Sequence, residues 1–153
     1  MKDFMSYADS LKILKDTINA WEKVEKVAIT DALDRNIAYD VTATENYPAK
    51  PVSAMDGYAF AFKEGLSELE LITDLPAGSD KGLVIEGNKC VKTFTGSLMS
   101  EGTDTLVPVE NVEVNGSKIL IKKSVPKGFA VREVGESYKK GEMITLVVND
   151  KEY

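Results

Sequence analysis

The segment Val52-Ser53-Ala54-Met55-Asp56-Gly57-Tyr58-Ala59-Phe60, or VSAMDGYAF, marks the point at which the pattern of the chain changes. Its apolar residues are typical of a buried strand, but Asp56 and Gly57 interrupt them. Pro48 and Pro51 lie just before it and hold the backbone extended. We therefore expect a constrained loop that directs the Asp56 carboxylate outward, with Gly57 allowing a sharp or left-handed turn after it. The alternative is that Asp-Gly only makes a turn.

Downstream of Tyr47 the chain has short segments rich in Val, Ile, Thr and aromatic residues, separated by Gly, Pro, Asn and Asp. This spacing predicts a coiled antiparallel sheet or partial barrel. The Asn115-Gly116 step predicts a tight hairpin, and further turns are expected at 75–78 and 86–88. The expected strands are 58–62, 69–73, 89–94, 104–109, 111–114, 118–122, 129–134 and 142–148.

Upstream of this region the pattern is mixed. Ser6, with Asp9 three residues later, resembles a capping box, and apolar residues at helical spacing follow, which predicts a helix over about 7–20. Its apolar stripe is interpreted as a packing face. A strand is expected over 24–30, a helical turn over 31–35 and an extended piece over 37–44. The fold class is therefore mainly β with a short α+β part.

Composition excludes several classes of protein. The 153 residues are 43% hydrophobic and 29% charged, which is typical of a globular protein. The net charge of −6 disfavours nucleic acid as a partner. No apolar run is long enough for a membrane span and no signal peptide begins the sequence, so we expect a cytoplasmic protein that does not bind membranes.

The absence of histidine limits the chemistry most strongly. Ser-His-Asp, Cys-His and His-metal schemes are excluded, which leaves carboxylates, hydroxyls, lysines, backbone amides or an oxygen-liganded cation such as magnesium. Cys90 is the only cysteine, so we expect neither a disulfide nor a cysteine-based zinc site, and interpret it as a small buried hydrophobic residue. Gly-rich phosphate-binding loops are also absent from the sequence.

Two further segments are candidates for binding. In Lys92-Thr93-Phe94-Thr95-Gly96-Ser97, a hydroxyl beside a residue without Cβ can approach a ligand closely; the alternative is a plain strand end. In Val131-Arg132-Glu133-Val134-Gly135-Glu136-Ser137, the Arg132 guanidinium suits the oxygens of a phosphate or molybdate-like anion. The alternative there is solvated charge on a strand edge.

These motifs together resemble the MoeA-type molybdopterin molybdenumtransferases, whose eukaryotic relatives include the E domain of gephyrin. The resemblance rests on Tyr47-Pro48, on Ser53-Ala54-Met55-Asp56-Gly57-Tyr58-Ala59, on Phe94-Thr95-Gly96, on residues 101–110 (EGTDTLVPVE), and on Arg132 with Gly135-Glu136. The S-A-M-D-G-Y-A run is the most specific of them. The resemblance extends from the first helix to about Gly141, and covers less than half of a family member.

The resemblance implies the two N-terminal subdomains of the family, with coiled or bifurcated β-sheets. On that basis residues 1–41 plus 139–153 form a mixed α+β subdomain, and residues 42–138 form an inserted β-rich one. The α/β molybdopterin-binding domain and the C-terminal β domain of the family have no counterpart in the 153 residues. The family also implies a homodimer in which this β-rich subdomain closes over the partner's cleft.

The family's reaction inserts molybdenum from molybdate into adenylyl-molybdopterin, with release of AMP and with Mg²⁺ as a helper. The resemblance implies catalytic roles for Asp56 and Thr95, and implies that an adenylyltransferase supplies the substrate. The expected substrate-binding residues are Ser53, Gly57, Gly96 and Arg132. We expect this chain to be inactive by itself.

Two departures from the family pattern leave an alternative open. Lys50-Pro51-Val52 replaces the usual Phe-Asp before the signature serine. Arg132-Glu133-Val134 and Gly135-Glu136-Ser137 replace consecutive arginines followed by G-E-D, so Ser137 takes the place of a second carboxylate. The alternative is a non-catalytic scaffold or dimerisation module of the same fold.

Overall fold

The structure, a computed structural model, describes residues 5–17, 24–144, 147–148 and 151–152. It confirms a mainly β chain, with a single α-helix in the described part. The chain divides by its internal contacts into two compact units, Met1–Asp40 and Val41–Tyr153. The expected grouping of 139–153 with 1–41 stays a prediction. Among the described residues, no helix has the length and apolar character needed to cross a membrane.

The first unit contains helix α1 (Tyr7–Thr17). The predicted cap is confirmed: the Ser6 hydroxyl accepts a hydrogen bond from the Asp9 amide at 3.1 Å and donates one to the Asp9 carboxylate at 2.6 Å. These bonds satisfy an amide that the first turn of a helix leaves without a backbone partner. The predicted residues 18–20 lie outside the described part. None of the residues of α1 is buried.

The predicted strand over 24–30 is wrong. That segment is irregular and leads into a short 3₁₀ helix, Ile29–Asp31, two residues before the predicted helical turn. A strand exists only through hydrogen bonds to a neighbour, and no described segment pairs with 24–30. The Ile29 side chain is 89% exposed. In the expected extended piece over 37–44, Thr42 alone forms a bridge, to Met143.

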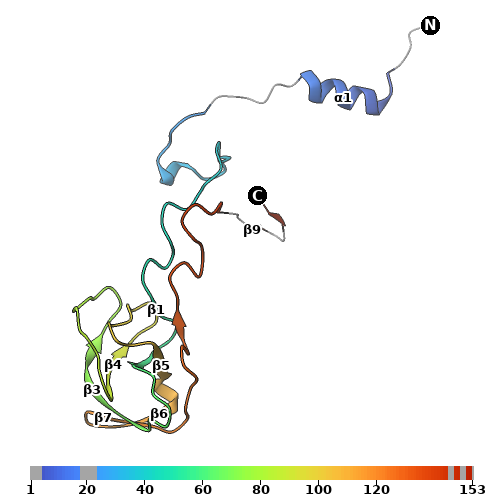
Figure 1. The fold of residues 1–153 in the computed structure, drawn as a ribbon. Helices are drawn as coiled ribbons and strands as arrows, with labels where there is room; N and C mark the ends of the chain where they lie inside the picture. Colours follow the sequence, from blue (N-terminus) through green and yellow to red (C-terminus); the bar gives the residue numbers. More distant parts are fainter. Residues whose placement is uncertain (1–4, 18–23, 145–146, 149–150, 153) are drawn as a thin grey trace. The chain divides into compact units, whose positions relative to one another are not determined.

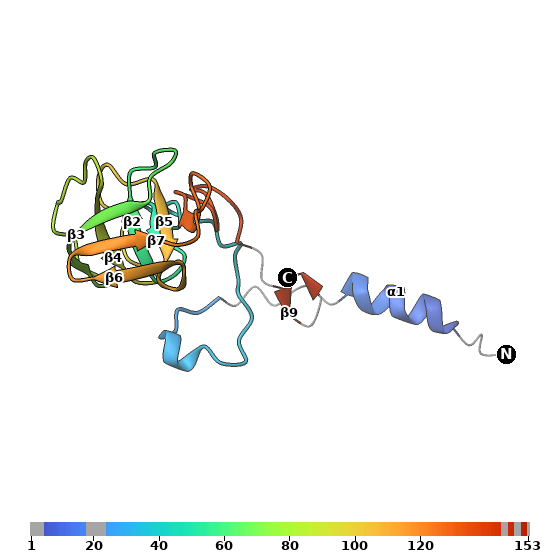
Figure 2. The same cartoon turned by 90° about the horizontal axis from the view of Figure 1, so that it is seen from below.

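The second unit is built on a six-stranded sheet with the strand order β5-β2-β4-β3-β7-β6. Figures 1 and 2 show that this sheet curls on itself. A separate two-stranded pair joins β1 (Val52–Ser53) to β8 (Val131–Arg132). The strand expected over 129–134 is thus reduced to the two residues of β8. The sheet strands are β2 (Gly57–Phe60), β3 (Glu68–Leu75), β4 (Lys89–Thr93), β5 (Thr105–Pro108), β6 (Val112–Asn115) and β7 (Lys118–Ile121).

The hairpin prediction is confirmed, because β6 and β7 pair antiparallel up to Asn115 and Lys118. The expectation of a wholly antiparallel sheet is wrong at one place. Strands β3 and β4 run parallel, with Glu70 opposite Lys89 and Leu75 opposite Thr93. A parallel pair needs a crossover of about a dozen residues, and segment 76–88 supplies it. Both turns predicted within this region lie in that crossover.

Alternating residues of the sheet build two clusters of buried side chains. This alternation follows from the two-residue period of a strand. Cys90 belongs to the first cluster and is fully buried, as expected, and burial raises the pKa of its thiol to about 12. The first cluster is Tyr58, Phe60, Leu69, Cys90, Val107 and Ile119; the second is Ala59, Leu75, Ile85 and Val91.

Segments 41–48 and 135–144 run antiparallel beside each other in the second unit. The Tyr47 amide donates to the Tyr138 carbonyl at 2.9 Å, and the Ala43 amide donates to the Glu142 carbonyl at 2.8 Å. The rings of Tyr47 and Tyr138 stack with centroids 5.5 Å apart. Of the strand expected over 142–148, the described residues show the Met143 bridge and β9 (Val147–Val148), which pairs with β10 (Lys151–Glu152); residues 145–146 lie outside the described part.

Candidate functional site

The loop 54–56 connects β1 to β2 and is held from both sides. The Ser53 amide donates to the Ser97 carbonyl at 2.8 Å, and the Gly96 amide donates to the Ser53 carbonyl at 2.9 Å. The Ala54 amide donates to the Ala130 carbonyl at 2.9 Å. Ser53 itself is 1% exposed, and its hydroxyl donates to the Met55 carbonyl. In this structure Ser53 shapes the loop; its predicted contact with substrate stays a prediction.

The register of the sheet brings Asp56 to Thr95. Gly57 at the start of β2 pairs with Thr93 at the end of β4, so the residues just outside these strands meet. Asp56 Oδ1 accepts hydrogen bonds from the Thr95 amide at 2.8 Å and from the Thr95 hydroxyl at 3.0 Å. Both residues are exposed. Two residues chosen from separate sequence motifs thus lie in direct contact.

Three groups hold the pKa of the Asp56 carboxyl below its usual value. The largest effect comes from the Thr95 amide, followed by the Thr95 hydroxyl, while the charge of Lys92 contributes less. Hydrogen bonds and positive charge both favour the ionised form. Within the described residues, Asp56 Oδ2 has no hydrogen-bond partner and faces solvent as an acceptor.

The conformation of Gly57 differs from the one expected, while its predicted contact with substrate stays a prediction. Its φ angle is not in the left-handed region, so it makes no left-handed turn. A Cβ at this position would overlap the Val107 carbonyl oxygen and the Leu106 side chain. Glycine is needed because β5 passes too close for any side chain. It thereby lets β2 begin directly after Asp56.

Gly96 does adopt a left-handed conformation, with φ of 83°. It is the third residue of a turn closed by the Ser97 amide, which donates to the Phe94 carbonyl at 2.8 Å. Buried Ser97 supports this turn, since its hydroxyl accepts from the Phe94 amide at 3.1 Å and donates to the Leu75 carbonyl at 2.9 Å. Ser97 closes the candidate segment 92–97 but was given no role from the sequence; a serine directly after a Thr-Gly turn was the available signal.

Arg132 lies opposite Val52 in the β1–β8 pair. Its guanidinium donates to the Glu136 carboxylate at 3.3 Å and to the Ser137 hydroxyl at 2.5 Å. Among the described residues, no hydrogen bond or ion pair joins Arg132 to Asp56 or Thr95. Its predicted binding of anions stays a prediction, and Ser137 acts here as its hydrogen-bond partner.

Lys92 is a second residue of segment 92–97 that was given no role from the sequence. It lies on β4 opposite Tyr58, three residues before Thr95, and its Nζ is 5.5 Å from the centroid of the Phe94 ring. The side chain is half-buried. The available signal was the alternation of β4, which places Lys92 and Phe94 on the same face.

The residues near Asp56 can hold a magnesium ion only in part. Carboxylate and hydroxyl oxygens are suitable ligands, and Mg²⁺ commonly binds through one or two carboxylates together with waters and substrate phosphates. Within the described residues, no group of three or more acidic, cysteine or histidine side chains converges on one point. The chemistry of Asp56 therefore fits a hydrated ion completed by ligands outside this loop.

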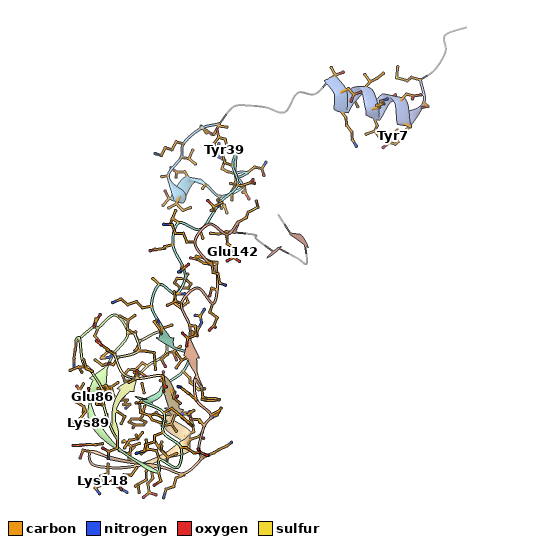
Figure 3. All side chains as sticks on the ribbon, in the orientation of Figure 1. Tyr7, Tyr39, Glu86, Lys89, Lys118 and Glu142 are labelled. Carbon is orange, nitrogen blue, oxygen red and sulfur yellow. The ribbon has the colours of Figure 1, made fainter. Side chains whose placement is uncertain are left out.

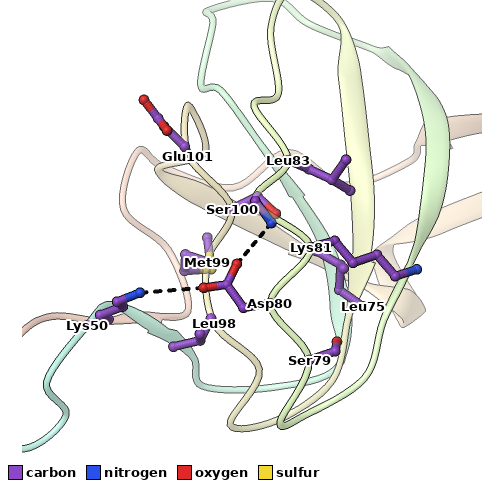
Figure 4. A pocket seen from close by; sticks show the side chains of 11 residues that line it. Lys50, Leu75, Ser79, Asp80, Lys81, Leu83, Leu98, Met99, Ser100 and Glu101 are labelled. Carbon is purple, nitrogen blue, oxygen red and sulfur yellow. Dashed lines mark hydrogen bonds and ion pairs between the residues drawn. The ribbon is translucent and has the colours of Figure 1, made fainter.

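A pocket among the described residues lies away from this site. It has a volume of about 290 Å³ and lies between the crossover 76–88 and segment 98–101 (Figure 4). An ion pair between Lys50 and Asp80 at 3.5 Å crosses it. Neither Asp56 nor Thr95 lines it.

Comparison with known proteins identifies the family. The family described as the MoeA N-terminal region (domain I and II) matches residues 5–146. Gephyrin from Dictyostelium discoideum is 29% identical over 153 residues, covering 90% of this chain and 21% of that protein. A molybdopterin molybdenumtransferase from Nostoc is 26% identical over 149 residues, covering 91% and 34%.

A solved structure agrees with these sequence matches. The molybdopterin biosynthesis moeA protein from Pyrococcus horikoshii OT3 superimposes with a TM-score of 0.85 at 31% identity, covering 93% of this chain and 39% of that one. The chain thus spans well under half the length of these relatives. The match over residues 5–146 and the shared fold show that this chain belongs to the family of the MoeA N-terminal region, domains I and II.

Proposed function

We propose that the chain is the N-terminal part of a molybdopterin molybdenumtransferase, which inserts molybdenum from molybdate into adenylyl-molybdopterin and releases AMP. The observation that carries this proposal is the exposed Asp56–Thr95 pair, in which residues from two signature motifs form one site. The names of the Nostoc protein and of the moeA structure support it. A role of this kind places the protein in molybdenum cofactor biosynthesis, and a cytoplasmic location stays a prediction.

In this proposal Asp56 is the acidic group of the site and Thr95 fixes it in place. Two hydrogen bonds to Oδ1 orient the carboxylate and keep it ionised, while Oδ2 remains open toward a ligand. A magnesium ion, when bound, would neutralise phosphate charge beside the cleaved phosphoanhydride. Asp56 would hold that ion through its bound waters. Ser53, Gly57 and Gly96 maintain the two loops, and Arg132 is proposed to contact an anion.

The site is proposed to be completed by a second chain. An exposed pair at the ends of strands β2 and β4 cannot exclude water from a reacting group, so it needs a facing surface. A homodimer would supply this surface, and the exposed apolar residues of the first unit, Ile29 and Leu33 among them, would be suited to an interface. We also propose that residues 1–41 plus 139–153 and residues 42–138 are two subdomains, and that an adenylyltransferase delivers the substrate.

The test measures AMP release from adenylyl-molybdopterin with and without molybdate. It uses a longer polypeptide, in which these 153 residues are followed by the α/β molybdopterin-binding domain and the C-terminal β domain of the family. The 153-residue chain alone is the comparison, which we expect to be inactive. Asp56→Asn should slow turnover about a hundredfold or more, because it removes a preorganised charge. Asp80→Asn changes another exposed carboxylate and is the matched control. Full activity of Asp56→Asn would contradict the catalytic role.

A second function is favoured by one observation. The Ser137 hydroxyl accepts a hydrogen bond from Arg132, at the position where the resemblance implies a second carboxylate. A non-catalytic scaffold or dimerisation module of the same fold would tolerate this replacement. Absence of molybdate-dependent AMP release from the longer polypeptide, together with stable dimers in solution, would favour the scaffold.

A further inference from the structure

The Asp56–Thr95 pair has no hydrogen-bond donor left for an anionic ligand. The one hydroxyl hydrogen of Thr95 and its amide both go to Asp56. The amide of Gly96 goes to the Ser53 carbonyl. A threonine hydroxyl donates one hydrogen and an ionised carboxylate donates none. The pair therefore presents acceptors and negative charge, which repel a phosphate or molybdate oxygen.

Lys92 can supply the missing donors. Its Nζ has three hydrogens, and within the described residues it has neither an ion-pair partner nor a hydrogen-bond acceptor. Five other lysines in the same part of the chain do have such partners: Lys50, Lys81, Lys118, Lys122 and Lys127. The lysines of this part that share the lack of a partner with Lys92 are exposed, whereas Lys92 is half-buried: Lys63, Lys89, Lys123, Lys139 and Lys140. Desolvation of a charged group costs free energy that a hydrogen-bonded anion restores.

The register places Lys92 on the same side of the sheet as Asp56. Lys92 pairs with Tyr58, and Thr93 pairs with Gly57, so Asp56 lies near the level of Phe94. Residues two apart on a strand share a face, and the Nζ of Lys92 lies over the Phe94 ring. The ammonium is thus held by an aromatic contact. The attraction between Lys92 and Asp56 is consistent with this placement.

We propose that Lys92 binds a tetrahedral oxyanion beside the Asp56–Thr95 pair. The shared chemistry is that of a phosphate group or of molybdate, and the choice between them rests on the proposed function. Lys92 would then contribute the positive charge that the two motif residues lack. The alternative is that Lys92 only balances Asp56, which precedes β2, and Asp74, which lies opposite Lys92 on β3.

The test is a titration of the 153-residue chain, labelled with ¹⁵N, with sodium molybdate, inorganic phosphate or AMP at constant ionic strength in chloride. We expect saturable shifts of the amides of residues 93–96 and 56–57. Lys92→Gln should weaken binding about tenfold, as expected for loss of one charge-assisted hydrogen bond. Lys92→Arg should retain most of the affinity.

Lys89→Gln is the matched control, because it removes the same charge from the other end of the same strand (Figure 3). Equal loss of affinity in Lys89→Gln and Lys92→Gln would overturn the proposal, as would the absence of saturable shifts with all three anions. A variant that fails to fold is recognised by its circular dichroism, and Lys92→Met, which retains the apolar stem, then replaces Lys92→Gln.

The anion that saturates binding shows whether Lys92 contacts molybdate or a nucleotide phosphate. Saturation by molybdate alone assigns Lys92 to the metal oxyanion, and saturation by phosphate and AMP assigns it to the nucleotide phosphate. In the longer polypeptide, Lys92→Gln should raise the KM of the corresponding substrate. Binding through Lys92 without molybdate-dependent AMP release would overturn the proposed function and leave this inference standing.

Discussion

The two units of the chain differ in how far they bury their apolar side chains. In the second unit, buried side chains fill both faces of a curled sheet, and Leu69, Leu106 and Ile119 are completely buried. In the first unit, helix α1 and the 3₁₀ helix Ile29–Asp31 have no buried residue. Hydrophobic burial is the main favourable contribution to folding. The comparison therefore teaches that the stability of the described structure resides in the second unit.

The largest expected effect tests the difference between the two units at the core of the second unit. Leu69→Ala should lower the free energy of unfolding of the second unit by about 2–5 kcal/mol, because it leaves a cavity among fully buried side chains. Leu14→Ala in α1, where Leu14 is 54% exposed, should change it by less than about 0.5 kcal/mol. Urea denaturation followed by circular dichroism measures both. Similar losses in the two variants would contradict the difference between the units.

The next effect concerns the start of β2. Gly57→Ala should cost about 1–3 kcal/mol, since the new methyl group overlaps the Val107 carbonyl and the Leu106 side chain. Gly96→Ala, where no atom lies within 4 Å of the added Cβ, should cost about 1–2 kcal/mol, from its positive φ alone. Urea denaturation again gives the values. A neutral Gly57→Ala would mean that β5 can move away without cost.

A smaller effect is expected at the cap of α1. Ser6→Ala should destabilise the helix by about 0.5–1 kcal/mol, because the Asp9 amide loses its acceptor. The loss should appear as lower helicity at 222 nm. The urea midpoint of the second unit should stay unchanged. A shifted midpoint would show that the two units unfold together.

The smallest effect is confined to one carboxyl group. Because the folded pKa of Asp56 is lowered, its bonds to Thr95 stabilise the fold above the usual carboxyl pKa of about 3.9, and this contribution is lost as the pH falls through the lowered value. Thr95→Val keeps the amide bond but removes the hydroxyl bond, so the pKa of Asp56 should rise partway toward its usual value. Carboxyl ¹³C chemical shifts against pH measure it.

Asp80 provides the internal reference for that titration. Its pKa is also lowered, chiefly by the Gly82 amide and by Lys50, and Thr95 plays no part in this. Thr95→Val should therefore leave the Asp80 titration unchanged. A parallel shift of both groups would indicate a general change in charge or fold and would remove Thr95 as the specific cause.

Local chemistry explains which elements could be predicted from the sequence. The hairpin at Asn115-Gly116 and the cap at Ser6 depend on neighbouring residues alone, and both were correct. The strand predicted over 24–30 failed because β-branched residues need a pairing partner that lies elsewhere in the chain. The parallel pairing of β3 with β4 depends on the path of the crossover 76–88, which short-range patterns do not specify.

The candidate site was predictable only in its components. The motifs identified Asp56 and Thr95, but their contact arises from the pairing of β2 with β4. Gly57 was assigned to a turn because the sequence does not reveal that β5 passes above it. Lys92 lacks a motif of its own, and it becomes a candidate only once its face of the sheet and the partners of the other lysines are known.

The pairing of β2 with β4 also determines where insertions into this protein can be tolerated. Asp56 and Thr95 are 39 positions apart, yet their contact is made at the ends of two short strands. Within residues 61–88, β3 pairs with β4 and Leu75 supports the Thr95 turn through Ser97. Segments inserted into the loops of that interval can lengthen the molecule while the acid and its hydroxyl partner remain together. Deletion of one residue inside β2 or β4 would instead turn the following side chains to the opposite face.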